Sequence, residues 1–265
     1  MCIDITVTDI EVSVPGGLLR GEDTGSGDPV VLLHAGVTDR RVWDPTAARL
    51  RDAGYRVIRW DTRGYGQSPP SGGPYSLVAD ALAVLDARGV DSAHFVGLSQ
   101  GAATSVDTAI AAPGRVRTLT LVAPGLSGWE WPRLPGYERR AAAAECGDGP
   151  GLATEIARLW APMSFDGGAT GDAASQVIVD QVDTFLAEEE FEQDEPDARP
   201  HAASITAPAL VVLGDRDLDV ITEIGTLLAA WIPGARLVTL TGADHLLPLR
   251  VPDALHAELL AHLRT

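Results

Sequence analysis

One serine of this chain lies in a pattern that suits a catalytic nucleophile. Residues 97–101 read Gly-Leu-Ser-Gln-Gly, between an apolar, β-prone run at 93–96 and a run of small residues at 102–112 that favours a helix. A Gly-x-Ser-x-Gly turn between a strand and a helix holds its serine in strained backbone geometry, and its glycines let the two elements pass closely. We therefore expect the Ser99 hydroxyl to be exposed at the helix N-terminus, where the backbone N–H of Gln100 faces any oxyanion.

A serine hydroxyl becomes a strong nucleophile when a base removes its proton, and the base needs an acid to orient it. His245 follows the last predicted strand, in a loop beside the final helix, which places it near the serine turn. An earlier strand is followed by three aspartates. Of these, Asp215 suits a loop cap and Asp219 a helix cap, so Asp217 is best placed to reach the histidine. The order Ser…Asp…His predicts Ser99, Asp217 and His245 as nucleophile, acid and base. Asp215 is the alternative acid.

A second oxyanion donor is expected from the loop after the apolar run at 29–33. That loop reads His34-Ala35-Gly36-Val37. The backbone N–H of Gly36 is the first choice and that of Val37 the second. The alternative interpretation is that Gly36 only permits the turn.

The elements that must position these residues alternate along the chain between apolar strands and helices. Such alternation predicts an α/β fold with a mostly parallel, doubly wound, eight-stranded sheet. In the first strand Ile3, Ile5 and Val7 share one face. The predicted strands lie at 3–14, 18–22, 29–33, 55–60, 93–96, 116–122, 209–213 and 236–240, and the helices between them at 43–53, 75–88, 102–112, 220–231 and 252–263.

The alternation stops between residues 125 and 203, which contain no clear strand. Helices are predicted near 137–146, 151–161 and 172–190, so this stretch is interpreted as a helical insertion. It ends in an acidic run, 188–197, interpreted as a solvated helix face or a linker.

The composition excludes several other functions. The net charge of -17 disfavours nucleic acid and anionic membranes as partners. All 20 basic residues are arginine, which excludes a Schiff-base lysine, a Walker lysine and a Ser–Lys dyad. Cys2 and Cys146 have no CxxC neighbour, so neither a disulfide framework nor a zinc site is indicated, and a cytoplasmic location is expected. We expect no signal peptide, membrane span, cofactor or metal, and a monomer or homodimer.

The chain resembles the α/β-hydrolase superfamily over nearly its whole length, in the branch of serine esterases and enol-lactonases. The resemblance is carried by five segments in order, namely Leu-Leu-His-Ala-Gly at 32–36, Asp-x-Arg-Gly-x-Gly-x-Ser at 61–68, Gly-Leu-Ser-Gln-Gly at 97–101, Gly-x-x-Asp at 214–217 and Gly-Ala-Asp-His at 242–245.

The resemblance implies the roles given above to Ser99, Asp217 and His245, and an oxyanion hole formed by the backbone N–H groups of Gly36 and Gln100. It also implies a core domain of residues 1–124 and 204–265, with residues 125–203 as a helical cap over the C-terminal edge of the sheet. The 61–68 segment is expected to be a structural loop.

Two positions depart from the pattern of the family. Ala35 stands where glycine is usual, which leaves a methyl group near the oxyanion loop. Gln100 stands where Met, Leu, Gly or Ala is commoner, and its side chain is expected to bond either a cap residue or a substrate oxygen, or to be buried scaffold. Serine at position 99 argues against haloalkane dehalogenase and epoxide hydrolase chemistry, for which relatives carry aspartate.

The cap is expected to supply the substrate contacts. An aromatic, concave site suits a small, largely apolar acyl or lactone substrate, although the same side chains could form the cap's own core. Arg133, with Arg139 and Arg140 as alternatives, is expected either to meet a substrate carboxylate or to remain solvated. The other candidates for substrate binding are Trp129, Trp131, Trp160, Met163 and Phe165.

These observations predict a serine hydrolase that cleaves a small carboxylic ester or lactone through an acyl-enzyme on Ser99. The same three residues can also cleave carbon–carbon bonds, transfer acyl groups to acceptors other than water, or form peracids. A biosynthetic cyclase or lyase and a ligand receptor remain as alternatives on the same fold.

Overall fold

The computed structural model describes residues 7–187 and 191–265. One sheet contains the strands β1 (Val7–Val14), β2 (Gly17–Thr24), β3 (Pro29–Leu33), β4 (Arg56–Trp60), β5 (Ala93–Leu98), β6 (Val116–Val122), β7 (Ala209–Gly214) and β8 (Arg236–Leu240). They follow the order β1-β2-β4-β3-β5-β6-β7-β8. β2 pairs antiparallel with β1 and β4, and the other neighbours are parallel. The predicted mostly parallel, eight-stranded sheet is confirmed.

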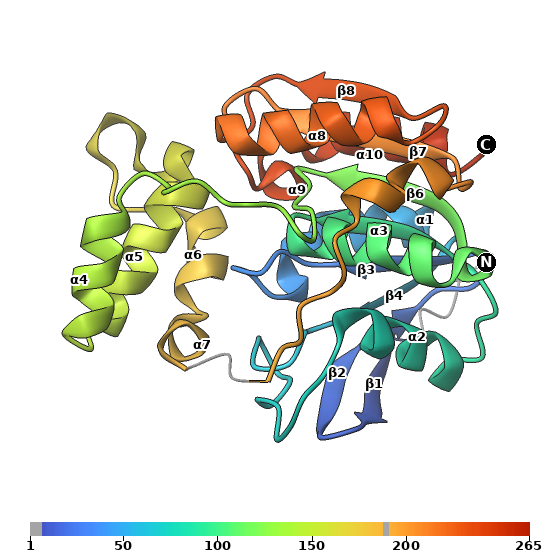
Figure 1. The fold of residues 1–265 in the computed structure, drawn as a ribbon, viewed down its shortest axis with the longest axis horizontal. Helices are drawn as coiled ribbons and strands as arrows, with labels where there is room; N and C mark the ends of the chain where they lie inside the picture. Colours follow the sequence, from blue (N-terminus) through green and yellow to red (C-terminus); the bar gives the residue numbers. More distant parts are fainter. Residues whose placement is uncertain (1–6, 188–190) are drawn as a thin grey trace.

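Helices cover both faces of this sheet (Figure 1), as the doubly wound prediction requires. One layer contains α2, α3 and α8, and the other contains α1 and α10. Each of them lies within a few residues of its predicted range. Their bounds are α1 (Asp44–Asp52), α2 (Leu77–Ala87), α3 (Gln100–Ala111), α8 (Asp219–Trp231) and α10 (Pro252–His262), with the short α9 (Leu247–Arg250) before the last.

The central strands are apolar because both of their faces are covered. All residues of β3, β5 and β7 are buried, as continuous apolar runs require in a parallel sheet between two helix layers. The edge strand β1 alternates instead, with Ile10, Val12 and Val14 buried. Ile3 and Ile5, which the sequence places on one face of this strand, lie outside the described residues.

The described part of residues 125–203 contains four further α-helices, which stand beside the sheet in Figure 1. They are α4 (Tyr137–Glu145), α5 (Gly149–Trp160), α6 (Ala173–Val179) and α7 (Val182–Leu186). The single helix predicted at 172–190 is wrong, because one helix ends at Val179 and another begins at Val182. Residues 188–190 of the predicted helix lie outside the described residues. The buried amide of Gln181 donates to Asp39 Oδ2 (2.8 Å) and accepts from the backbone N–H of Gly66 (3.1 Å). These hydrogen bonds to the core interrupt the helix, although the local sequence pattern favours a continuous one.

The described part of the acidic run is not helical, and its residues 188–190 lie outside the described residues. Residues 191–198, here called the acidic strap, form no helix. The backbone N–H of Tyr75 donates to Phe191 O (2.9 Å), and the N–H of Gln193 donates back to Tyr75 O (2.8 Å). The strap is therefore paired with the chain just before α2 and is not a free linker.

The 61–68 segment is a tight structural loop, as expected. Asp61 accepts the backbone N–H of Gln67 (2.9 Å), and Ser68 Oγ donates to the Asp61 carbonyl (2.7 Å). The guanidinium of Arg63 forms two hydrogen bonds with the carboxylate of Asp80 in α2, at 2.8 and 2.7 Å, and both side chains are buried. This ion pair attaches the loop to the helix layer that contains α3.

Candidate active site

Ser99 lies at the sharp turn between β5 and α3, with φ +54° and ψ -113°. A non-glycine residue rarely adopts this region, so the conformation is strained and must be held by its surroundings. The glycines on either side of Ser99 explain how its surroundings hold this conformation. A Cβ on Gly97 would collide with the carbonyl of Gly101, and a Cβ on Gly101 would collide with the carbonyl of Leu33. The strand, the turn and the helix can pack this closely only without those side chains.

The predicted acid and base are in contact. His245, in the loop after β8, donates from Nδ1 to Oδ2 of Asp217, in the loop after β7, at 2.8 Å. Both side chains are buried, with exposed fractions of 1% and 2%. Asp215 has a different partner, because its Oδ1 accepts the backbone N–H of Gly242 at 2.7 Å. The geometry therefore favours Asp217 over Asp215 as the partner of the histidine.

The second ring nitrogen of His245 is open for chemistry. Because Nδ1 donates to Asp217, Nε2 of the neutral ring is an acceptor. Nε2 is buried and has no hydrogen-bond partner among the described residues, Ser99 included. The indole of Trp160 packs against the ring, with centroids 4.5 Å apart. An unsatisfied buried polar atom needs an explanation, and exchange of a proton with a reacting group is one.

The side chains of His34 and Tyr65 each donate a hydrogen bond to a carbonyl of the loop after β3. The pKa of His34 is lowered by burial, so the ring is neutral. Its Nε2 accepts from the backbone N–H of Thr62 (2.9 Å), and its Nδ1 donates to Ala35 O (2.8 Å). The hydroxyl of Tyr65 donates to Gly36 O (2.6 Å).

These bonds orient both candidate oxyanion donors of this loop. In a trans peptide the N–H points away from the carbonyl, so the bond to Ala35 O orients the Gly36 N–H, and the bond to Gly36 O orients the Val37 N–H. Gly36, Val37 and Gln100 all line the cavity that contains Ser99. Within residues 7–187 and 191–265, the N–H groups of Gly36 and Gln100 have no acceptor.

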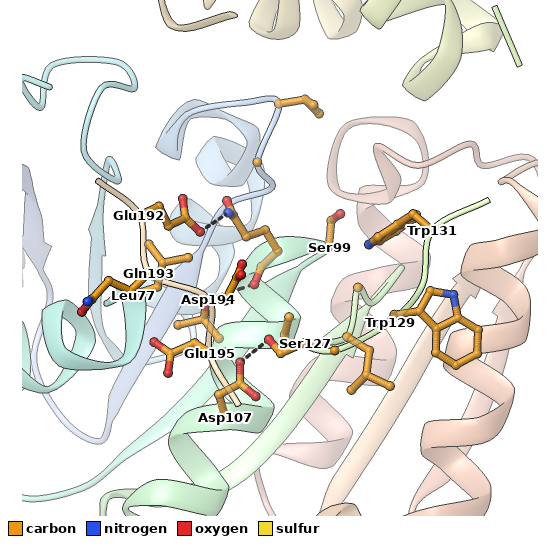
Figure 2. A pocket seen from close by; sticks show the side chains of 18 of the residues that line it. Leu77, Ser99, Asp107, Ser127, Trp129, Trp131, Glu192, Gln193, Asp194 and Glu195 are labelled. Atoms are coloured by element: carbon orange, nitrogen blue, oxygen red, sulfur yellow. Dashed lines mark hydrogen bonds between the residues drawn. The ribbon is translucent and has the colours of Figure 1, made fainter. Parts of the chain in front are cut away.

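The cavity beside Ser99 has a volume of about 650 Å³. Trp129, Trp131 and Trp160 line it, as predicted from the sequence. Figure 2 shows the first two on one side of Ser99, opposite the acidic strap. A cavity of this size, with aromatic walls, fits a small organic substrate.

Three other residues predicted to contact the substrate are absent from the described lining of this cavity. The guanidinium of Arg133 pairs with Glu138 at 2.7 Å, and its side chain is 65% exposed. The ring of Phe165 packs under the guanidinium of Arg158, 4.5 Å away. Met163 uses its backbone N–H to bond Asp244 Oδ2, at 3.1 Å. The lining depends on how the insertion packs against the core, which the sequence pattern does not reveal.

The opposite wall was not predicted from the sequence. Glu192, Gln193, Asp194 and Glu195 of the acidic strap line the cavity together with Asp107 of α3. Burial raises the pKa of Asp107 to about 7, against the lowering effect of the hydroxyl of Ser127, which donates to it at 2.6 Å.

A sequence signal existed for Asp107. It lies three, four and seven residues after Thr104, Ala103 and Gln100, which puts all four on one face of α3. All four line the cavity. For the strap, the sequence carries no such signal.

Two further features of the described residues bear on the site. No group of three or more His, Cys, Asp or Glu side chains in that part of the chain is arranged to hold a metal ion. None of its helices has the length and apolar character needed to cross a membrane.

Comparisons with known proteins agree with this architecture. A family model described as the alpha/beta hydrolase fold matches residues 28–250. The chain is 30% identical to 3-oxoadipate enol-lactonase 1 of Acinetobacter baylyi, over 71% of each protein. It is 29% identical to the rhodomycin D methylesterase DauP of Streptomyces sp. strain C5, over 91% of this chain and 93% of that protein.

The solved structures give the same result. The crystal structure of the enol-lactonase from Burkholderia xenovorans LB400 matches with a TM-score of 0.78 and 27% sequence identity, covering 97% of this chain and 100% of that one. These relatives are hydrolases by name, and the fold, the strained serine turn and the family match coincide. The chain belongs to the α/β-hydrolase fold family and is an enzyme of that family.

Proposed function

We propose that the protein is a serine hydrolase that cleaves small carboxylic esters or lactones through an acyl-enzyme on Ser99. The observation that carries this proposal is the buried hydrogen bond between His245 Nδ1 and Asp217 Oδ2, at 2.8 Å, which leaves Nε2 as an unpartnered acceptor. The strained turn that exposes Ser99 to the cavity supports it.

The reaction proceeds in two halves. In the first, Ser99 Oγ attacks the substrate carbonyl while His245 Nε2 accepts the hydroxyl proton, and Asp217 stabilises the resulting imidazolium. The N–H groups of Gln100 and of the 36–37 loop stabilise the oxyanion. The imidazolium then returns the proton to the leaving alkoxide, which departs as the alcohol and leaves an acyl ester on Ser99.

In the second half, water replaces the alcohol. His245 accepts a proton from a water molecule as its oxygen attacks the acyl carbonyl, and the oxyanion is held by the same N–H groups. Collapse of this intermediate breaks the bond to Ser99 Oγ, which takes the proton back from His245. A lactone follows the same path, except that the alcohol stays attached to the acyl group.

Residues 125–203 act as a cap in this proposal. Trp160 of α5 contacts both the cavity and the His245 ring. The cap is attached to the loop of His245 by Arg250, which bonds Asp244 Oδ1 (3.1 Å) and Asp172 Oδ2 (2.7 Å). Substrate therefore enters between the cap and the core formed by residues 1–124 and 204–265.

The first experiment is labelling with a fluorophosphonate, followed by mass spectrometry of the modified peptide. The proposal predicts one label, on Ser99. Labelling should be absent in Ser99→Ala, and its rate should be at least about a hundredfold lower in His245→Ala. His201→Ala is the matched control, because His201 is exposed and lies outside the cavity. Equal labelling of His245→Ala and His201→Ala, or no labelling of the folded wild type, would overturn the proposal.

A panel of esters, lactones and β-diketones with product analysis then separates the reaction classes. Release of acid and alcohol from esters or lactones supports the proposal. Cleavage restricted to the diketones would replace it with carbon–carbon bond hydrolysis by the same residues.

A further inference from the structure

The cavity beside Ser99 has an unusual balance of charge. Four carboxylates line it, from Asp107, Glu192, Asp194 and Glu195, and no arginine or histidine side chain does. The chain contains no lysine. The lining is therefore negatively charged at the place where the proposed substrate binds.

Three of these carboxylates lack a cationic partner within the protein. Among the described residues, Asp107, Asp194 and Glu195 form no ion pair. Other buried carboxylates do have one: Asp80 pairs with Arg63, and Asp244 with Arg250. The fold thus pairs Asp80 and Asp244 with arginines but gives the three cavity carboxylates no such partner among the described residues.

Asp107 gives an independent indication of a ligand. Its side chain is only 7% exposed, and Oδ2 accepts from the hydroxyl of Ser127 at 2.6 Å. No hydrogen bond from the described residues reaches its other oxygen, Oδ1, and the residue lines the cavity. A carboxylate that faces a cavity attracts a positively charged group bound there.

The opposite wall is aromatic. Trp129 and Trp131 lie across the cavity from the acidic strap, with Ser99 beside them (Figure 2). The faces of indole rings attract cations and repel anions. Both walls therefore favour the same sign of charge on a bound molecule.

We propose that the substrate of this enzyme carries a positively charged amine, held by the carboxylates of Asp107, Asp194 and Glu195. This inference rests on the proposed function, because it names the substrate class of the same site. It also replaces the sequence-based expectation that an arginine meets a substrate carboxylate, since Arg133 lies outside the cavity.

The helix α3 indicates where the ammonium group lies. Ser99 and Asp107 are separated by eight residues along the helix, which corresponds to about 12 Å at 1.5 Å per residue. The carboxylates of the strap lie along the same side of the cavity. The amine is therefore at the end of an arm that extends from the reacting carbonyl along α3, and not on the carbon atom bonded to the carbonyl.

The test uses p-nitrophenyl esters that differ only at the end of the acyl chain. One ends in trimethylammonium, one in the isosteric tert-butyl group and one in a carboxylate, each with a short and a long methylene arm. We expect kcat/KM for the cationic ester to exceed that of the neutral isostere about tenfold or more, and the anionic ester to be the slowest. Added salt should reduce the ratio, because screening weakens the attraction.

Variants assign the preference to the acidic wall. Asp194→Asn with Glu195→Gln should reduce the ratio of cationic to neutral ester by about fivefold or more. Asp197→Asn is the matched control, because it removes one charge from the same strap at a position that does not line the cavity. Asp107→Asn should act in the same direction as the strap variants.

The outcomes separate this inference from the proposed function. Hydrolysis of the neutral ester at a rate equal to or above that of the cationic ester, for both arm lengths, overturns the inference and leaves the proposed function standing. A cation preference that is equal in the strap double variant and in Asp197→Asn also overturns it. If none of the esters is hydrolysed by the folded enzyme, the proposed function fails and the inference fails with it.

Discussion

Gln100 donates a hydrogen bond from Nε2 to Oε1 of Glu192, at 3.1 Å, and so joins the residue after Ser99 to the acidic strap. The two residues are 92 positions apart in the chain. Oε1 of the same amide lies against Gly36, where an added Cβ would approach it to 2.8 Å. The side chain of Gln100 thus contacts a cap residue, one of the roles expected for it, and also the oxyanion loop.

Substitution of Gln100 is predicted to act through the strap. Gln100→Met removes the bond to Glu192 but keeps the backbone N–H that faces the oxyanion, so KM should rise by about three- to tenfold with a smaller change in kcat. Gln100→Glu should be worse, because it places two carboxylates in contact. Steady-state kinetics on one ester checks both, and a lower KM for Gln100→Glu than for wild type would contradict the interpretation.

Asp217 and Asp215 are predicted to differ sharply. Asp217→Asn disturbs the tautomer and orientation of His245 and should lower kcat about 10³- to 10⁴-fold. Asp215→Asn keeps an oxygen that can accept the backbone N–H of Gly242, so its kcat should fall less than about tenfold. Each variant removes one negative charge, and the two positions are only two residues apart, so the pair is a matched comparison. A larger loss in Asp215→Asn would show that the assignment of the acid is wrong.

Asp107 is predicted to make the stability of the fold depend on pH. Burial raises its pKa to about 7 from the usual 3.8, so the folded state holds its proton more tightly than the unfolded state between these values. Stability attributable to this group is therefore highest at low pH and is lost as pH rises toward about 7. Asp107→Asn cannot ionise but keeps an acceptor for Ser127.

The difference in melting temperature between Asp107→Asn and wild type should accordingly grow in favour of the variant from pH 4 to pH 8. We expect a gain on the order of 1–2 kcal/mol, or about 2–6 °C, at the upper end. Differential scanning calorimetry across this range is the measurement. Asp86→Asn, which changes a carboxylate exposed at the surface, should show no such trend, and a difference independent of pH would contradict the burial of a charged Asp107.

The buried ion pair of Arg63 and Asp80 is predicted to be important for stability. Asp80→Ala leaves a guanidinium buried without its partner and should cost about 3–5 kcal/mol of unfolding free energy. Asp86→Ala breaks the pair between Asp86 and Arg115. Because the Asp86 side chain is 68% exposed, this change should cost at most about 1 kcal/mol of unfolding free energy. Urea denaturation of both variants measures the difference. Equal midpoints would mean that the buried pair contributes no more than a surface pair.

Local patterns in the sequence were sufficient to predict the sheet and its helices. The runs of β3, β5 and β7 are apolar except for His94, because both faces of a parallel sheet are covered. Failures occurred where distant contacts decide the backbone. Gln181 interrupts the predicted helix at 172–190 because its amide bonds Asp39 and Gly66, and neither partner is visible in the local periodicity.

The sequence by itself determined the fold class and named Ser99, Asp217 and His245 as candidates, because turn motifs and strand ends are encoded over a few neighbouring residues. Tertiary structure alone decided that the carboxylates of the acidic strap line the cavity and that Met163, Phe165 and Arg133 do not. The sign of charge around the substrate depends on how residues 191–198 return across α3 after about 90 intervening positions. Long-range packing of this kind follows from the free energy of the whole fold, and no local pattern encodes it.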